Sequence, residues 1–347
     1  MVDSWQLQLQ TLGATITDGE AQNFGDPAAE LAAAASSTVV ADISHLGLIQ
    51  VSGPDALTFL QGQLTQDVAK ITGERAAYAG FCSPKGRLLA HFLVWNSGES
   101  YFLQLPRPLL EAIQKRLKMY VLRSKVTLAD ISQETIRFGL AGADAANIIA
   151  ARFGRAPAQP MDVVSITAGT VVALPNRRFQ IIVANDAVDL WQKLAQAARA
   201  VGAPAWRWLQ IQAGSPEIYA ATQEQFVPQM VNDDLLGAVS FQKGCYTGQE
   251  IVARLHYLGK AKRRMLDAHV DIQEAPQPGD PIYGDQLQGQ AIGTVVDAAP
   301  APQGGFDLLA SIPVDANSAA TGFYLNAPDG PVVHININNI NWLMERH

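Results

Sequence analysis

Stretches with strand-like and helix-like spacing of apolar residues follow one another through the first two thirds of the chain. Strands are predicted at residues 46–51, 77–81, 88–95, 101–105 and 135–140. Helices are predicted at 54–68, 108–120, 144–153 and 186–200, and a hairpin is predicted around 175–178. This order of strands and helices occurs twice. It predicts an α+β fold of antiparallel split βαβ modules rather than a parallel doubly wound sheet.

The pattern changes after Gly259. Short apolar runs, such as 291–296 and 306–312, are separated there by Pro-Gly, Gly-Asp and Gly-Gly pairs that are typical of turns. We therefore predict a C-terminal β-barrel over 259–347. The remaining predicted boundaries are an N-terminal arm or alanine-rich helix at 1–37, a first α+β module at 38–125 continued by 203–258, and a second, ferredoxin-like module at 126–202.

Composition narrows the class of protein. With 347 residues, 48% hydrophobic and 16% charged, the chain is typical of a soluble protein of several modules. A formal net charge of −7 argues against broad affinity for nucleic acid phosphates. The first ten residues contain no Lys or Arg, and no apolar run is long enough to cross a membrane. We expect a cytoplasmic protein without a membrane partner.

The two cysteines, Cys82 and Cys245, lie far apart in the sequence, and neither belongs to a Cys-x-x-Cys pair. Two thiols cannot form a disulfide framework, and they cannot supply the four ligands of a structural zinc site. No spacing of histidines completes such a set. We expect reduced thiols and no autonomous metal site.

The segment 243–250, Lys-Gly-Cys-Tyr-Thr-Gly-Gln-Glu, carries the strongest chemical signal. Thr247 and Glu250 have the spacing of a capping box, which predicts a helix over 248–255. Cys245 would then precede the positive end of a helix, and Lys243 adds a nearby positive charge, so both favour a thiolate. A buried, inert thiol is the alternative.

The same segment also has features of a ligand site. Gly244 and Gly248 allow close approach of a backbone, and Tyr246 offers a flat stacking surface. For several other candidate residues, the sequence does not decide between a structural role and a ligand-binding role. These are the helix-interior Gly62 between two glutamines, Trp206 at a module edge, the predicted turn at 83–87, and the basic stretch 260–264, which is expected to be solvated.

The segment 243–250 resembles the YgfZ family of folate-binding proteins, which is related to the aminomethyltransferase (T-protein) of glycine cleavage. Further similarity lies, in family order, at 60–67, 84–87, 211–216, 228–229 with Asn232, and 293–295. The resemblance implies a T-protein-like α+β fold around a central folate cavity, with a C-terminal β-barrel. It also implies a role in assembling or repairing iron–sulfur clusters in client enzymes, including radical enzymes that thiomethylate tRNA.

The resemblance also implies roles for particular residues. Trp206 matches a tryptophan implicated in folate binding, whereas a second family tryptophan corresponds to Leu46 here. Gln212 takes the position of a pterin-contacting glutamate. We assign Cys245 and Lys243 to the chemistry, and we assign tetrahydrofolate or a derivative to Trp206, Gln212, Tyr246, Gln249, Arg254 and Gln63.

One segment differs from the aminomethyltransferases. Their Lys-Gly-Gly-x-x-Asp-Asp corresponds to 85–91 here, where the two acidic positions become Ala90 and His91. Ala90 cannot replace a catalytic carboxylate. The sequence therefore favours a monomeric folate-binding accessory protein that acts on iron–sulfur client or assembly proteins. A tetrahydrofolate-dependent aminomethyl or methyl transferase is the alternative, and direct RNA binding through 260–264 is a weaker one.

Overall fold

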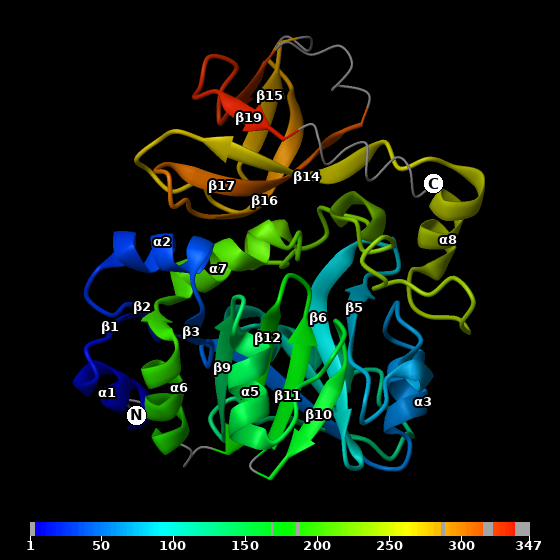
Figure 1. Cartoon of the computed structure of the whole chain (residues 1–347). Helices are drawn as coiled ribbons and strands as arrows, with labels where there is room; N and C mark the ends of the chain where they lie inside the picture. Colours follow the sequence, from blue (N-terminus) through cyan, green and yellow to red (C-terminus); the bar gives the residue numbers. More distant parts are fainter. Residues whose placement is uncertain (1–3, 168, 185–187, 286–288, 315–321, 337–347) are drawn as a thin grey trace. The chain divides into compact units, whose positions relative to one another are not determined.

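The computed structural model describes residues 4–167, 169–184, 188–285, 289–314 and 322–336 (Figure 1). The chain forms two compact units. The first unit comprises Met1–Phe59, Ala69–Ala77 and Leu93–Leu209, and the second comprises Leu60–Val68, Tyr78–Phe92 and Gln210–His347. The domain boundaries given above remain predictions.

A six-stranded sheet lies in the first unit, in the order β10-β11-β12-β9-β3-β13. The strands are β3 (Val39–Asp42), β9 (Thr135–Ala141), β10 (Val163–Ile166), β11 (Gly169–Leu174), β12 (Arg178–Ala184) and β13 (Arg199–Val201). Neighbouring strands are antiparallel except β3 and β13, which are parallel. The β11–β12 pair forms the predicted hairpin, and its turn places Asn176 and Arg177 at positive φ.

Three helices, α1 (Ser4–Thr11), α5 (Ala145–Phe153) and α6 (Val188–Ala197), contribute to the core of the first unit (Figure 1). Apolar side chains of α1, α5 and α6 pack there against strand residues such as Phe138 and Ile181. The hairpin β1 (Thr15–Thr17) and β2 (Glu20–Asn23) precedes α2 (Pro27–Ser36). The alanine-rich stretch thus forms α2, which starts with Asp26 accepting a hydrogen bond from the Ala29 amide at 3.0 Å.

A second, five-stranded sheet has the order β5-β6-β7-β4-β8. Its strands are β4 (Leu46–Ser52), β5 (Ala77–Cys82), β6 (Leu88–Ser97), β7 (Ser100–Pro106) and β8 (Thr127–Asp130). The short helix η2 (Arg107–Leu109) and α4 (Leu110–Lys118) follow β7. The helix predicted at 54–68 is wrong in length, because α3 covers only Ala56–Gln61 and a single turn, η1 (Val68–Lys70), follows later.

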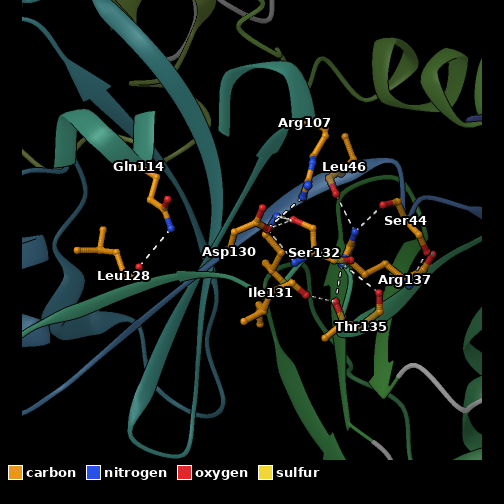
Figure 2. A network of polar contacts seen from close by, with 11 residues as sticks. Ser44, Leu46, Arg107, Gln114, Leu128, Asp130, Ile131, Ser132, Thr135 and Arg137 are labelled. Carbon is orange, nitrogen blue, oxygen red and sulfur yellow. Dashed lines mark hydrogen bonds and ion pairs between the residues drawn. The ribbon is translucent and has the colours of Figure 1, made fainter. Parts of the chain in front are cut away.

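A buried arginine ties the segment before β4 to β9 within the first unit. Figure 2 shows the guanidinium of Arg137 among oxygen atoms. It donates to the carbonyls of Ser44 and Leu46 at 2.6 and 2.7 Å and to the hydroxyl of Thr135 at 2.5 Å. Arg137 is completely buried, so these acceptors replace the water that its charge loses on folding.

The predicted C-terminal barrel is a six-stranded, nearly closed sheet in the order β18-β15-β16-β17-β14-β19. Its strands are β14 (Arg263–Val270), β15 (Pro281–Gly284), β16 (Ala291–Pro300), β17 (Phe306–Pro313), β18 (Phe323–Leu325) and β19 (Val333–Ile335). A bridge between Tyr324 and Val332 links the two ends of this order. The barrel core contains Leu266, Val295 and Leu308, each at most 3% exposed.

The remaining elements are α7 (Ala203–Gln212), η3 (Ala220–Thr222), η4 (Pro228–Val231) and α8 (Gln249–Leu258). With the sheets described above, they give the α+β class predicted from the sequence. Nearly all residues of β4 and β9 are buried, so continuous apolar runs rather than alternation made these strands predictable.

Gly139 on β9 gives a test of packing in the first unit. A Cβ atom at this position would lie 2.5 Å from Cζ3 of the buried Trp206 ring. We expect Gly139→Ala to lower the free energy of unfolding by about 1–3 kcal/mol, because the indole must shift. Urea unfolding measures the effect. Gly73→Ala is the control, since no atom lies within 4 Å of its Cβ position. Equal stability of the two variants would contradict this packing.

Candidate functional site

The two cysteines have opposite environments in the second unit. Cys245 is exposed, whereas Cys82 at the end of β5 is only 1% exposed. Burial, together with the nearby charge of Asp233, raises the pKa of the Cys82 thiol. Cys245 is therefore the thiol available to a reactant, as expected from the sequence, and Cys82 is a packed apolar group.

Helix α8 begins at Gln249, four residues after the exposed thiol, but without the predicted capping box. Its N-cap is Gly248, which has φ 83° and provides no side-chain cap. The capping prediction for Thr247 and Glu250 is thus wrong. Gly248 adopts the left-handed conformation because the backbone must turn sharply into the helix, and this tertiary requirement overrides the local spacing signal.

The start of α8 lies directly on the turn between β5 and β6. A Cβ atom at Gly248 would lie 2.8 Å from Cα of Gly86, and one at Gly86 would lie 2.8 Å from Cβ of Ile251. The turn itself closes with a hydrogen bond from the Gly86 amide to the Ser83 carbonyl at 2.9 Å. The turn predicted at 83–87 is confirmed, and two glycines allow the thiol segment to pack against it.

Lys243 is held by the segment that follows α3. Its Nζ donates to the carbonyl oxygens of Gln61, Leu64 and Gln66 at 2.8, 2.6 and 2.8 Å. All three ammonium hydrogens thus have acceptors. Burial lowers the pKa of Lys243 to about 8, and the charge of Asp67 opposes this shift. The ammonium therefore anchors the thiol segment to residues 61–66.

The same segment is also fixed on its other side. The Thr65 hydroxyl donates to the Ala238 carbonyl and accepts from the Gly80 amide, both at 2.7 Å. Gln61 donates to Asp67 at 2.9 Å and accepts from the Val68 amide at 2.7 Å. These contacts account for the early end of α3, because the backbone after Gly62 bonds to other parts of the second unit.

Tyr246 is buried rather than displayed, with 7% of its surface exposed. The Lys243 ammonium lies 5.2 Å from the centre of its ring. Burial and the nearby Cys82 raise the pKa of the Tyr246 hydroxyl. The ring is thus part of the packed interior, and its role as a stacking surface for folate remains a prediction.

The other polar residues assigned to folate in the second unit differ in exposure. Gln63 is half-buried, and its Oε1 is a buried acceptor without a hydrogen-bond partner among the described residues. Gln212 is exposed and donates to Asp307 at 3.0 Å. Gln249 and Arg254 lie on α8, half-buried and exposed respectively. The free Oε1 of Gln63 fits a ligand N–H group.

Trp206 belongs to the first unit and is 2% exposed. Its ring edge packs against Gly139, and the Arg178 guanidinium lies 5.8 Å from its ring centre. Leu46, at the position of the second family tryptophan, is 5% exposed. The alternative that Trp206 fills a core is thus favoured by its burial, and its contact with folate remains a prediction.

The basic stretch 260–264 is not uniformly solvated. Lys260 and Lys262 are exposed, but Arg264 on β14 is 8% exposed. Arg264 makes two contacts with the Asp234 carboxylate, at 2.6 and 3.0 Å, and donates to the Gln229 carbonyl at 3.0 Å. The expectation of a solvated charge is wrong for Arg264, because its guanidinium forms a buried ion pair with Asp234.

A buried histidine–aspartate pair in the second unit was not predicted. His91 Nε2 lies 3.2 Å from Asp233 Oδ1, and the two side chains are 4% and 0% exposed. Burial raises the pKa of Asp233, whereas the charge of His91 acts in the opposite direction. The two residues are far apart in the sequence, so no spacing pattern connects them. In the sequence, the one feature that could have pointed to this pair is the histidine that follows Ala90.

A cavity of about 310 Å³ lies in the first unit, and no residue assigned to the site from sequence lines it. Its walls include Asp42, Ser44, His45 and Arg107. Burial, with the charges of Arg207 and Arg137, lowers the pKa of His45 to about 3. The imidazole is therefore neutral, and its Nδ1 is buried without a hydrogen-bond partner among the described residues.

Within 4–167, 169–184, 188–285, 289–314 and 322–336, no group of three or more His, Cys, Asp or Glu residues is arranged to hold a metal ion. Within the same ranges, no helix has the length and apolar character needed to span a membrane.

Comparison with known proteins gave consistent matches. Residues 18–243 match the GCVT N-terminal domain family. The tRNA-modifying protein YgfZ of Pectobacterium carotovorum subsp. carotovorum is 32% identical over 255 residues, covering 73% of this chain and 76% of that protein. The protein of the same name from Photorhabdus laumondii subsp. laumondii is 35% identical over 241 residues, covering 68% and 72%. These matches confirm the resemblance found in segment 243–250.

A solved structure supports the fold independently. Aminomethyltransferase T of the glycine cleavage system from Bartonella henselae superposes with a TM-score of 0.78, covering 96% of this chain and 95% of that chain. The sequences are 18% identical, so the likeness concerns the fold alone. The predicted T-protein-like architecture is confirmed.

Replacing the Lys243 ammonium tests its anchoring role. We expect Lys243→Met to lower the free energy of unfolding by about 1–3 kcal/mol, because three carbonyl groups lose their donor. Amide hydrogen exchange at residues 61–68 should become faster. Urea unfolding and exchange mass spectrometry measure the two effects. Lys262→Met, at an exposed position, should change stability by less than about 0.5 kcal/mol. Unchanged exchange at 61–68 in Lys243→Met would refute the anchor.

Proposed function

The chain belongs to the YgfZ family of proteins with a GCVT N-terminal domain, and on that premise we propose that it is a folate-binding accessory protein. In this proposal it assists the assembly or repair of iron–sulfur clusters in client enzymes. By that route it supports tRNA modification indirectly, in keeping with the names of its relatives.

The observation that carries the proposal is an exposed thiol on a rigid support. Cys245 is exposed, while the residues on either side of it are fixed by the Lys243 anchor and by the contact between Gly248 and the turn at Gly86. A thiol held in this way can contact a macromolecular client without rearrangement of the backbone. This arrangement suits a group that acts on a cluster, or briefly holds part of one.

The folate site is proposed from the family together with the chemistry of the residues. A reduced pterin offers ring N–H and amino donors, which suit the free Oε1 of Gln63 and the amide of Gln212. Trp206, Tyr246, Gln249 and Arg254 complete the proposed set. Bound tetrahydrofolate would supply one-carbon or redox chemistry of the pterin ring, and these residues would bind and orient it.

A helper role is favoured over aminomethyl transfer by the residue at position 90. Ala90 is completely buried in β6 and carries no group that can exchange a proton. The transferase alternative draws support from a different observation, the buried pair of His91 and Asp233, which could supply acid–base chemistry. Turnover of an aminomethyl donor by the purified protein with tetrahydrofolate would establish the alternative.

We propose protein clients rather than direct contact with RNA, because the chain has a formal net charge of −7 and Arg264 is occupied by Asp234. We further propose that the protein acts as a monomer in the cytoplasm. Gel-shift titration with tRNA at physiological salt tests the RNA alternative.

Folate binding is tested by titration with tetrahydrofolate while tryptophan fluorescence is recorded. We expect saturable binding by the wild type and binding at least about tenfold weaker for Trp206→Phe, because a large aromatic contact is lost. Trp95→Phe is a matched control, since Trp95 is also buried, stacks on Phe102 and is not assigned to the ligand. Absence of saturable binding to the wild type would remove folate from the proposed function.

The thiol is tested in cells that lack the chromosomal gene. We expect Cys245→Ala to abolish support of client iron–sulfur enzymes, because the other cysteine of the chain, Cys82, is buried. Folding should be unaffected, because Cys245 is exposed. Cys82→Ala should retain support if it folds. The readouts are thiomethylated tRNA and the cluster content of the purified client. Full client activity with Cys245→Ala would disprove the thiol assignment.

A further inference from the structure

The cavity of about 310 Å³ in the first unit has no part in the function proposed above. All of its lining residues belong to the first unit, and none of them is assigned to folate or to the thiol. Its walls combine the exposed Asp18, Pro108 and Gln133 with Trp5 and Asp42, which are each 2% exposed. The cavity thus has a side open to solvent and a buried side. Its volume is at the lower end of those that hold small-molecule ligands.

The buried side of the cavity holds a carboxylate with one occupied and one open oxygen. Oδ1 of Asp42 accepts from the Trp5 indole at 2.8 Å, and from the hydroxyl and the amide of Ser44 at 2.7 and 3.3 Å. Oδ2 accepts no hydrogen bond from the described residues, and it is not one of the polar atoms sealed from solvent. Because Asp42 lines the cavity, Oδ2 is an acceptor that a ligand in the cavity can reach.

The Asp42 carboxylate has no ion pair with a Lys, Arg or His of the described residues. The charge of Arg137 acts on it, but the Arg137 guanidinium donates to the Ser44 and Leu46 carbonyls and to the Thr135 hydroxyl. Burial raises the pKa of Asp42, and its hydrogen bonds and the charge of Arg137 oppose this shift. A cation next to Oδ2 would therefore stabilise the ionised form that burial disfavours.

The other charges on the cavity wall also favour a positively charged ligand. Asp18 and Glu20 add two carboxylates, of which Glu20 lies 3.9 Å from the Arg207 guanidinium. Arg107 is the one Lys or Arg among the lining residues, and it is paired with Asp130 at 3.0 Å. The wall thus has three carboxylates, and its one cation is already paired with a carboxylate outside the wall.

Several hydrogen-bond donors on the wall are already bonded within the protein. The Trp5 indole and the Ser44 hydroxyl donate to Asp42, and the Ser132 hydroxyl donates to a neighbouring carboxylate at 2.5 Å. The imidazole of His45 is neutral, because burial lowers its pKa to about 3, so it does not repel a cation. The wall therefore presents open acceptors, and a ligand rich in N–H donors suits it.

We propose that this cavity binds a short aliphatic diamine, one ammonium group of which donates a hydrogen bond to Oδ2 of Asp42. An ammonium group combines a full positive charge with three N–H donors, so it supplies both the counterion and the donors that the wall lacks. The carboxylates of Asp18 and Glu20 favour a second ammonium group over an apolar or acidic end. The inference does not depend on folate binding or on the thiol, since the cavity uses different residues.

Calorimetric titration of the full chain with 1,4-diaminobutane tests the proposal. We expect saturable binding of the diamine and none of butane-1,4-diol, which has the same length without charge. Asp42→Asn should weaken diamine binding at least about tenfold, because the amide keeps an acceptor for Trp5 and Ser44 but removes the charge. Asp144→Asn is the matched control and should bind like the wild type, since Asp144 is exposed, does not line the cavity and makes no capping bond to α5.

NMR of the tryptophan indole groups gives a second readout, which needs only a folded wild type if Asp42→Asn folds poorly. The Trp5 indole lines the cavity and donates to Asp42, so its N–H signal should shift when the diamine binds. The sequence has six tryptophans, and the spectrum of Trp5→Phe identifies the signal of Trp5. Trp95 is the internal control, because it is buried in β6 and does not line the cavity.

Four results would overturn the amine site. The first is no saturable binding of the diamine at millimolar concentrations. The second is equal affinity of Asp42→Asn and the wild type, and the third is binding of the diol as tightly as the diamine, which would show a site for neutral ligands. The fourth is saturation without a shift of the Trp5 signal, which would place the diamine elsewhere on the protein. None of these results bears on tetrahydrofolate binding, so the proposed function is tested separately.

Discussion

The hydrogen bonds of Lys243 are the constraint on which the thiol segment depends. A lysine ammonium has three donors, and here each donor meets a backbone carbonyl of residues 61–66. Gln61 is the last residue of α3, where a helix has unpaired carbonyl oxygens, and Leu64 and Gln66 lie in the segment that follows. One cation thus binds the end of α3 and the segment after it, and fixes the residue two positions before Cys245.

Close packing of glycines sets the other side of the thiol segment. Gly248 and Gly86 approach within distances that a methyl group would block, so α8 starts directly over the β5–β6 turn. Strand β6, which contains Ala90 and His91, follows this turn. Backbone contacts, which tolerate no added side chain at these two positions, therefore connect the turn before β6 with the loop that carries Cys245.

The sequence predicted those features that depend on local patterns. The strands β4 to β7, the turn at 83–87 and the barrel followed from short apolar runs and turn residues, since these signals lie within short stretches. The family, and with it the fold, followed from segment 243–250. Cys245 is exposed, but its chemical role stays a prediction, and the predicted capping box did not form. The length of α3 and the N-cap of α8 were wrong because contacts with distant residues decide both.

Long-range electrostatics was the part that the sequence could not reveal. Arg264 pairs with Asp234, and His91 contacts Asp233, so two adjacent acidic residues have different partners on different strands. No spacing rule predicts which of the two carboxylates forms the ion pair with the arginine. Asp234 is therefore paired with a guanidinium, which stays protonated, whereas burial raises the pKa of Asp233, whose contact is an imidazole.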